Sequence, residues 1–298
     1  MARVVRYQIT HSTLYTYSHP VELGSHCVKL CPRTDGQQRL QQFHLEVDPL
    51  PQQHTRLLDP DGNVADRFWF DPQPVQSLKF VTTAEVEVVC QNPFDYLAAP
   101  WAIACPWDYP SSLALRLYPY RQLTTPHPRV VELAQDLLHQ VEGNAGLFVS
   151  QLTQRIYEDC RYIHRLEGAP QLPGITLSQR TGTCRDFALL WVEACRVAGL
   201  AARFVSGYQR GDETTTQHEL HAWGEVYMPG GGWRGFDPTL GLAVTDGHIA
   251  VAATGDPRRA APVSGDIQSP LGRPQTSLVC DIRLVDDALF SQTQSQSQ

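Results

Sequence analysis

Residues 184–198 constrain the fold of this chain most, because their pattern predicts a helix that begins at a cysteine. Gly182 suits a turn and Thr183 suits the N-cap, and Asp186 can reach back to that cap in a variant of the capping box. The apolar side chains that follow have the spacing of one α-helical face: they are Phe187, Leu190, Trp191, Ala194, Cys195 and Ala198. The pattern therefore places Cys184 in the first turn of a helix with one buried face.

The first turn of a helix is a reactive environment for a cysteine. The backbone N–H groups there have no partner within the helix, and the positive end of the helix dipole lies among them. Such a position favours the thiolate over the thiol, and the amide of Cys184 is placed to hold an oxyanion. A helical cysteine is otherwise a small core residue, and Cys195, on the apolar face of the same predicted helix, is interpreted in that way.

Two downstream segments provide a candidate base and a group to orient it. Residues 221–227 alternate in the manner of a β-strand, residues 229–232 suit a turn, and residues 233–237 suit a second strand. If the strands pair as a hairpin, His221 at the start of the first faces Asp237 at the end of the second. Taken alone, the histidine would be interpreted as a strand residue and the aspartate as a turn former. Together with Cys184 they form a candidate nucleophile–base–orienter triad, whose members can occur in any chain order.

Four motifs around these residues resemble the bacterial transglutaminase-like family. They are residues 182–188 (GTCRDFA), 201–208 (AARFVSGY), 221–226 (HAWGEV) and 232–239 (GWRGFDPT). The resemblance implies a papain-like Cys-His-Asp core, with Cys184, His221 and Asp237 as catalytic residues. It is specific for the family and its core chemistry, and unspecific for the substrate.

The resemblance also extends to both sides of that core and covers roughly residues 4 to 265. Residues 7–18 (YQITHSTLYTYS), 30–33 (LCPR) and 59–63 (DPDGN) are similar to the β-rich N-terminal region that accompanies the core in bacteria. Residues 248–252 (HIAVA) and 255–262 (GDPRRAAP) fit the end of the core. The fold class implied is α+β, a β-rich N-terminal domain followed by a papain-like or transglutaminase-like core.

The patterning along the chain predicts where these units begin and end. Residues 1–95 alternate as strands and form the N-terminal domain, and residues 96–128, rich in proline, form a connecting segment. Helices are predicted over 130–141 and 147–160 within a catalytic core of residues 129–285. Residues 286–298, mostly serine and glutamine, are expected to be disordered.

Composition is that of an ordinary globular protein and excludes some partners. The 298 residues are 42% hydrophobic and 18% charged, and the formal charge of −7 leaves no basic stripe for nucleic acid or an anionic membrane. No apolar run approaches the length of a membrane span, and the first ten residues lack the apolar run of a signal peptide. We therefore expect a cytoplasmic protein with a protein or peptide substrate, whose eight scattered cysteines are reduced and mostly buried.

Metal and substrate contacts are less constrained. His218 and His221 have a spacing that suits a helix rather than a strand, and His26 with Cys27 and Cys31 lacks a second paired set nearby, so no metal site is expected. Three aromatic side chains near the motifs are candidates for substrate contacts, with packing as an equal alternative: they are Tyr162, Trp223 and Trp233.

The chemistry implied is a cysteine-dependent acyl transfer through a thioester. Water as the second nucleophile would make the chain a cysteine protease or amidase, and a lysine amine would make it a cross-linking acyltransferase. The family resemblance favours hydrolysis, because a specialised tunnel that excludes water is not evident. No cofactor is expected. Two alternatives remain, a catalytically silent scaffold that binds a protein partner, and an interaction protein in which residues 1–90 recruit a partner.

Overall fold

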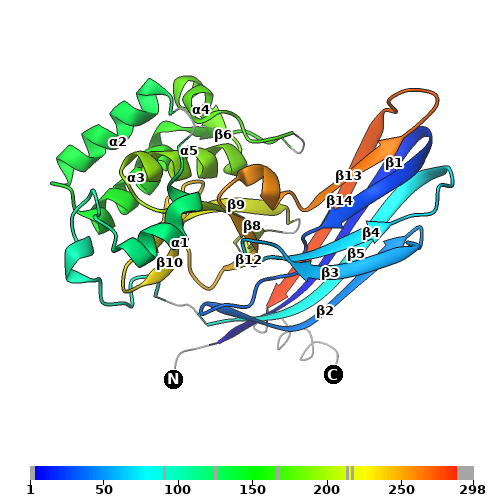
Figure 1. The fold of residues 1–298 in the computed structure, drawn as a ribbon, viewed down its shortest axis with the longest axis horizontal. Helices are drawn as coiled ribbons and strands as arrows, with labels where there is room; N and C mark the ends of the chain where they lie inside the picture. The colour runs from blue at the N-terminus through cyan, green and yellow to red at the C-terminus, as the bar shows by residue number, and fades with distance from the viewer. Residues whose placement is uncertain are drawn as a thin grey trace.

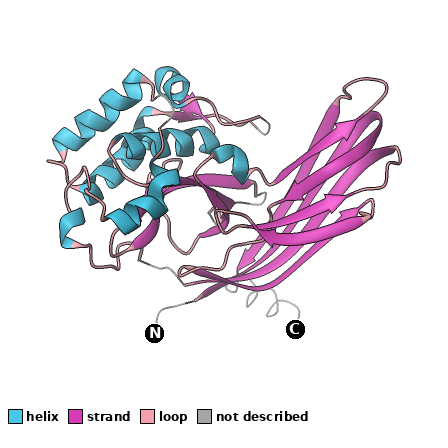
Figure 2. Ribbon diagram, in the orientation of Figure 1, coloured by secondary structure: helices cyan, strands magenta, loops and turns pink. Residues whose placement is uncertain are grey.

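The computed structural model describes residues 4–286, apart from 90–91, 124–125, 166–167, 213–214 and 216–217. A long, twisted β-rich half-barrel lies beside a mixed α/β core (Figures 1 and 2). The predicted α+β class, with a β-rich N-terminal unit before a transglutaminase-like core, is confirmed. No helix in these described ranges is both long enough and apolar enough to cross a membrane.

The half-barrel is built around one strand, β1 (Val5–Val28), whose buried and exposed side chains alternate over its first half. This period of two is that of a strand with one buried face. The sheet order is β2-β5-β1-β4-β3, with β13 and β14 also paired to β1. The bounds of the other strands are β2 (Gln38–Asp48), β3 (Gln53–Leu58), β4 (Val64–Trp69), β5 (Val75–Val88), β13 (Val263–Gln268) and β14 (Thr276–Asp286).

The last two strands correct the predicted extent of the core. Residues 129–285 were expected to form one unit, but β13 and β14 return to the N-terminal sheet and pair with the second and first halves of β1, respectively. Alternation in β14 is visible in the sequence, since Ile282 and Leu284 are buried on either side of exposed Arg283. Alternation predicts a strand but does not identify its partner. The predicted disordered tail, 286–298, lies outside the described residues except for Asp286.

The proline-rich segment 96–128 is part of the core rather than a spacer. It contains a short 3₁₀ turn, η1 (Pro100–Ala102), and a helix, α1 (Ser111–Arg121). Trp107, Tyr109 and Leu117 are buried in the same hydrophobic cluster as the helices that follow. The many prolines of this segment argued against a helix in the sequence. In the structure only Pro119 lies inside α1, and it lies in the last turn.

The core places its helices on one face of a five-stranded antiparallel sheet (Figure 2). The sheet order is β11-β10-β9-β8-β12. The predicted helices over 130–141, 147–160 and 184–198 are confirmed within a few residues as α2, α3 and α5. The bounds are α2 (Pro128–Gln140), α3 (Ala145–Asp159), β6 (Arg161–Tyr162), α4 (Pro173–Gln179), β7 (Thr181–Gly182), α5 (Cys184–Val197), β8 (Ala202–Gln209), β9 (Leu220–Met228), β10 (Gly232–Asp237), β11 (Leu242–Ala243), β12 (His248–Thr254) and the 3₁₀ turn η2 (Pro257–Ala260).

Helix α5 is held on the sheet by a tight contact with β9. The indole of Trp191 is fully buried and stacks on Phe236 with 5.5 Å between ring centroids. A Cβ at Gly224 would lie 2.2 Å from Cε3 of Trp191. Only glycine therefore lets the helix approach the strand this closely.

We expect Gly224→Ala to destabilise the protein by about 1–3 kcal/mol, the usual range for overpacking a core. The measurement is urea denaturation followed by tryptophan fluorescence. Gly36→Ala is the matched control, because a Cβ at Gly36 meets nothing within 4 Å. Equal midpoints for the two variants would contradict the close contact.

The half-barrel and the core share one hydrophobic cluster. Tyr7 and Ile9 of β1 pack with Tyr208 of β8 and Ile249 of β12. The turn that DPDGN predicts joins the same interface, because the side-chain amide of Asn63 donates to the carbonyl of Ala253 at 3.0 Å and accepts from its N–H at 2.8 Å. The two units therefore form one continuous body.

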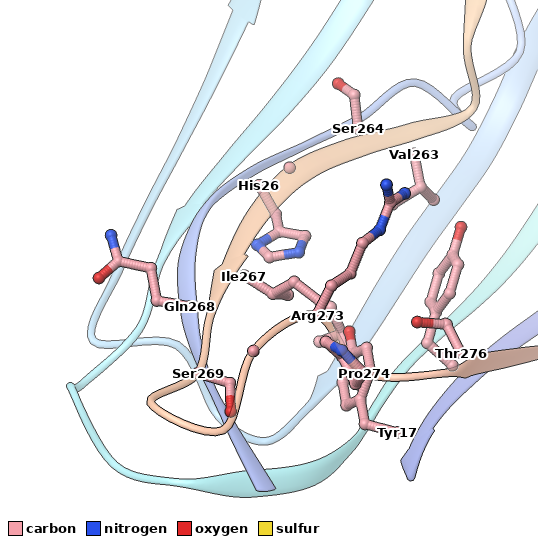
Figure 3. A pocket seen from close by; sticks show the side chains of 14 residues that line it. Tyr17, His26, Val263, Ser264, Ile267, Gln268, Ser269, Arg273, Pro274 and Thr276 are labelled. Atoms are coloured by element: carbon pink, nitrogen blue, oxygen red, sulfur yellow. The ribbon is translucent and has the colours of Figure 1, made fainter. Parts of the chain in front are cut away.

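A surface hollow of about 750 Å³ lies within the half-barrel, where β13 and β14 diverge (Figure 3). Its lining includes Tyr17, His26, Arg273 and Thr276. None of its lining residues belongs to the motifs around Cys184. This hollow is therefore separate from the candidate active site.

Candidate active site

Cys184 is the first residue of α5, as predicted. The capping box is also confirmed, because Oδ2 of Asp186 accepts a hydrogen bond from the backbone N–H of Thr183 at 2.8 Å and another from its hydroxyl at 3.0 Å. Burial raises the pKa of Asp186, but hydrogen bonds from Thr183, Gln171 and Arg165 outweigh burial and hold it below its ordinary value. Asp186 is therefore a charged helix cap, which fixes where the helix, and with it Cys184, begins.

The residues just before the helix place an aromatic ring beside the cysteine. β6 and β7 pair in parallel, which sets Tyr162 opposite Gly182. Burial, followed by the charges of Cys184 and Glu219, raises the pKa of Tyr162 to about 12. The ring is 47% exposed. Tyr162 therefore lies near the thiol on the side that is open to solvent.

The predicted hairpin of β9 and β10 is confirmed, with a turn at residues 229–231. Phe236 pairs with Gly224, so Asp237 stands opposite Trp223, and His221 lies two residues farther along β9 on the same face. Side chains at such diagonal positions are within reach of each other. Nε2 of His221 lies 2.6 Å from Oδ2 of Asp237. Since Nε2 bonds to Asp237, Nδ1 is the ring nitrogen left for another partner.

Cys184 lies beside this imidazole, because its side chain is among the groups that raise the pKa of His221. Burial would lower the pKa of His221, but the charge and hydrogen bond of Asp237, together with the contact to Cys184, raise it to about 10. The imidazolium form is therefore favoured at neutral pH. For Asp237, burial acts in the opposite direction and raises the pKa. The charge and hydrogen bonds of His221 and His248 outweigh burial and hold the pKa of Asp237 far below the usual range.

The cysteine side chain is enclosed by small and aromatic side chains. Cys184 is 6% exposed and packs with Ala188, Phe204, Ala222 and Ala260. Ala260 belongs to η2, so the segment after β12 closes one wall of the site. The structure thus brings Cys184, His221 and Asp237 together from one helix and one hairpin.

A second histidine lies on the same carboxylate. His248, the first residue of β12, is buried, and its Nε2 lies 3.0 Å from Oδ2 of Asp237. The sequence included it in a motif, but no role was inferred for it. The available signal was one imidazole at the start of a strand of which all the residues are buried.

The two tryptophans have ring partners within the protein. Trp223 is 1% exposed, and its ring packs edge-on against His248 with 5.2 Å between centroids. Trp233 packs against Tyr227 and the guanidinium of Arg203, four positions before Asp237 and roughly 13 Å away along a strand. Both rings therefore have packing partners in and around the hairpin, and a substrate contact by either of them stays a prediction.

Among the described residues, His221, Asp237 and His248 form the group whose ligand atoms come within 4.8 Å of one another. Two imidazoles and a carboxylate are donors that Zn²⁺ accepts, but a metal there would replace the hydrogen bond between His221 and Asp237. His218 does not join this group, because its Nε2 lies 2.9 Å from the carbonyl of Arg210. His26 instead bonds the carbonyl of Gly24.

Comparison with known families identifies both parts of the chain. Residues 7–87 match the bacterial transglutaminase-like N-terminal region, and residues 131–238 match the transglutaminase-like superfamily. An uncharacterized protein of Mycobacterium tuberculosis is 30% identical over 287 residues, which covers 88% of this chain and 87% of that protein. A protein-glutamine gamma-glutamyltransferase of Pseudomonas aeruginosa is 32% identical over 137 residues, which covers 42% of this chain and 20% of that protein.

A solved structure shares the overall architecture. The crystal structure of a protein of Cytophaga hutchinsonii, proposed to be a cysteine protease, superposes with a TM-score of 0.71. The match covers 96% of this chain and 91% of that one at 20% sequence identity. At this identity the likeness concerns the fold, and it includes both the half-barrel and the core.

Proposed function

Because this chain belongs to the bacterial transglutaminase-like family, with the N-terminal region and the core both present, we propose that it is a cysteine-dependent acyl-transfer enzyme. The observation that carries the proposal is the contact chain from Cys184 at the helix start through His221 to Asp237. Its substrates are peptide bonds or glutamine side-chain amides in proteins or peptides. The relative from P. aeruginosa that is named for glutamine chemistry supports the second class.

In the first half-reaction, Sγ of Cys184 attacks the carbonyl carbon while His221 carries the proton. The C–N bond then breaks, and His221 gives its proton to the departing amine or ammonia, which leaves a thioester. The N–H of Cys184, which has no partner within the helix at this position, stabilises the oxyanion. Asp237 keeps the imidazole in the tautomer and orientation that both proton transfers need.

In the second half-reaction, water is the nucleophile that we propose. His221 takes a proton from water as the oxygen attacks the thioester, and the thiolate of Cys184 leaves to give a carboxylate product. The rim of the site supports hydrolysis over cross-linking. Tyr162 is half-exposed there, and the hydrogen bond between Nε2 of His164 and Oε1 of Glu219, 2.6 Å long, is exposed as well, so water has access to this rim.

The activity is tested with a peptide library that contains internal glutamines. Mass spectrometry distinguishes backbone cleavage, the mass shift of deamidation, and incorporation of an added primary amine. Cleavage or deamidation that is lost in Cys184→Ala supports the proposal. Amine incorporation in excess of hydrolysis would identify a cross-linking enzyme instead.

Thiol labelling tests the nucleophile without a known substrate. At pH about 6 an ordinary thiol is almost wholly protonated, and burial raises the pKa of other cysteines further, to about 11 for Cys31 and Cys160 and about 12 for Cys105. None of the seven described cysteines is in a disulfide. We expect limiting iodoacetamide to label Cys184 first, because it lies at a helix start beside the imidazolium of His221.

The matched comparison is Cys280, which is exposed and therefore the most accessible competitor among the described cysteines. The preference for Cys184 should weaken in His221→Ala, because the cationic partner is lost. The readout is peptide mapping of the labelled cysteines over time. If Cys184 labels no faster than Cys280, the chain is better explained as a silent scaffold that binds a protein partner.

A further inference from the structure

The carboxylate of Asp237 is shared by two imidazoles. Oδ2 lies 2.6 Å from Nε2 of His221 and 3.0 Å from Nε2 of His248, and Oδ1 accepts the backbone N–H of Thr239 at 2.8 Å. Asp237 itself is fully buried. The orientation of this carboxylate is therefore set by three donors, of which His221 is only one.

We propose that His248 is a positioning residue of this site, which holds the Asp237 carboxylate in the orientation that His221 requires. This inference rests on the proposed function, since it concerns the same triad. The side-chain hydrogen bond of His248 is made to Asp237. His248 acts through Asp237.

The protonation of His248 follows from its partners. A carboxylate can only accept, so Nε2 of His248 must carry the hydrogen that it shares with Asp237. Nδ1 of His248 is buried and has no hydrogen-bond partner among the described residues. His248 therefore points its donating nitrogen at Asp237.

Packing holds the ring of His248 with Nε2 toward Asp237. Its backbone pairs with Gln209 of β8, and Trp223 of β9 lies against the ring edge-on. A cavity of about 10 Å³ beside the ring is also lined by Asp35 and Glu225. Both acids face basic partners, Asp35 lying 3.6 Å from Arg33 and Glu225 lying 2.6 Å from Arg203. Asp237 is thus the carboxylate that His248 bonds.

Without His248, the carboxylate would lose one of its two donors on Oδ2 and could turn away from Nε2 of His221. The imidazole would then spend less time aligned with Cys184. In metal sites, loss of an outer partner that orients a ligand commonly lowers affinity or activity by about 10- to 100-fold. We expect an effect of similar size here. The effect should reach the reactivity of Cys184 through Asp237 and His221.

The experiment measures the rate of Cys184 alkylation by iodoacetamide from pH 5 to 9 in the full chain, together with the proton NMR signal of the N–H between His221 and Asp237. We expect His248→Leu to slow labelling about 10-fold or more, in the range of outer-partner effects, and to broaden or shift that signal. His248→Gln should restore most of the rate, because its amide nitrogen can occupy the place of Nε2. His26→Leu is the control, since His26 is an equally buried histidine of the half-barrel.

Each outcome supports or overturns the inference. If His248→Leu is folded and labels Cys184 at the wild-type rate with an unchanged signal, the positioning role is wrong. If His248→Leu does not fold, His248→Asn, whose shorter amide cannot reach Oδ2, replaces it with the same expected result. An absence of preferential labelling in the wild-type protein would instead reject the proposed function, whatever the His248 variants do.

Discussion

Replacement of Cys184 by alanine is expected to reduce turnover to background, because the thioester cannot form without its sulfur. His221→Ala should have nearly the same effect, since the thiolate and the proton donor work as one unit. The double variant should then be no worse than either single variant, because the losses of such residues are not additive. The measurement is the initial rate on the peptide substrate identified from the library.

Cys280→Ala is the matched control for this prediction. Cys280 lies on β14, where its Sγ is 3.2 Å from Nε2 of His11, so it is a second cysteine beside a histidine. The proposed mechanism gives this pair no role, and the rate of the control should stay at the wild-type level. Activity that survives in Cys184→Ala would reject the mechanism.

Asp237→Ala is expected to lower the rate by about 10²–10⁴-fold, as for other orienting groups of a triad. The variant leaves two imidazole donors without their acceptor in the interior, so it should also destabilise the protein. Asp237→Asn should retain more activity, because its side-chain oxygen still accepts from Nε2 of His221, as in Cys-His-Asn proteases. Initial rates and thermal unfolding separate the two effects.

The asparagine variant also makes a prediction about pH. The negative charge of Asp237 helps to raise the pKa of His221 to about 10, so its removal should lower that pKa. The imidazolium would then be lost at lower pH, and the alkaline limb of Cys184 labelling should move in the same direction. An unchanged alkaline limb in Asp237→Asn would mean that Asp237 does not set the charge of His221.

Local patterns were sufficient to predict the parts of the site that are made by local structure. The helix at Cys184 depends on residues within one turn, Thr183 and Asp186, and the hairpin depends on the short turn after Met228. Both elements, and the approach of His221 to Asp237, follow from such short-range rules. The meeting of the helix with the hairpin followed from the family resemblance rather than from spacing.

The features that the sequence did not predict depend on contacts between distant segments. His248 comes from β12, which is separated from β9 by β8. No spacing rule specifies this strand order. Trp223 was a substrate candidate because an aromatic ring looks the same in sequence whether it packs inward or faces a cleft. β13 and β14 pair with β1 across more than two hundred residues of sequence. Local alternation predicts such strands but does not identify their partner.

The pairing of β1 with β14 has a consequence for how the chain is made. On a ribosome, Tyr7 emerges well before its partner Asp286. All the strands of the catalytic sheet lie between them in the sequence, so they emerge before the half-barrel can be completed. One edge of β1 therefore stays unpaired while the core is synthesised, and exposed strand edges are prone to wrong pairings. The nascent chain is thus the state in which this edge is most open to wrong pairing.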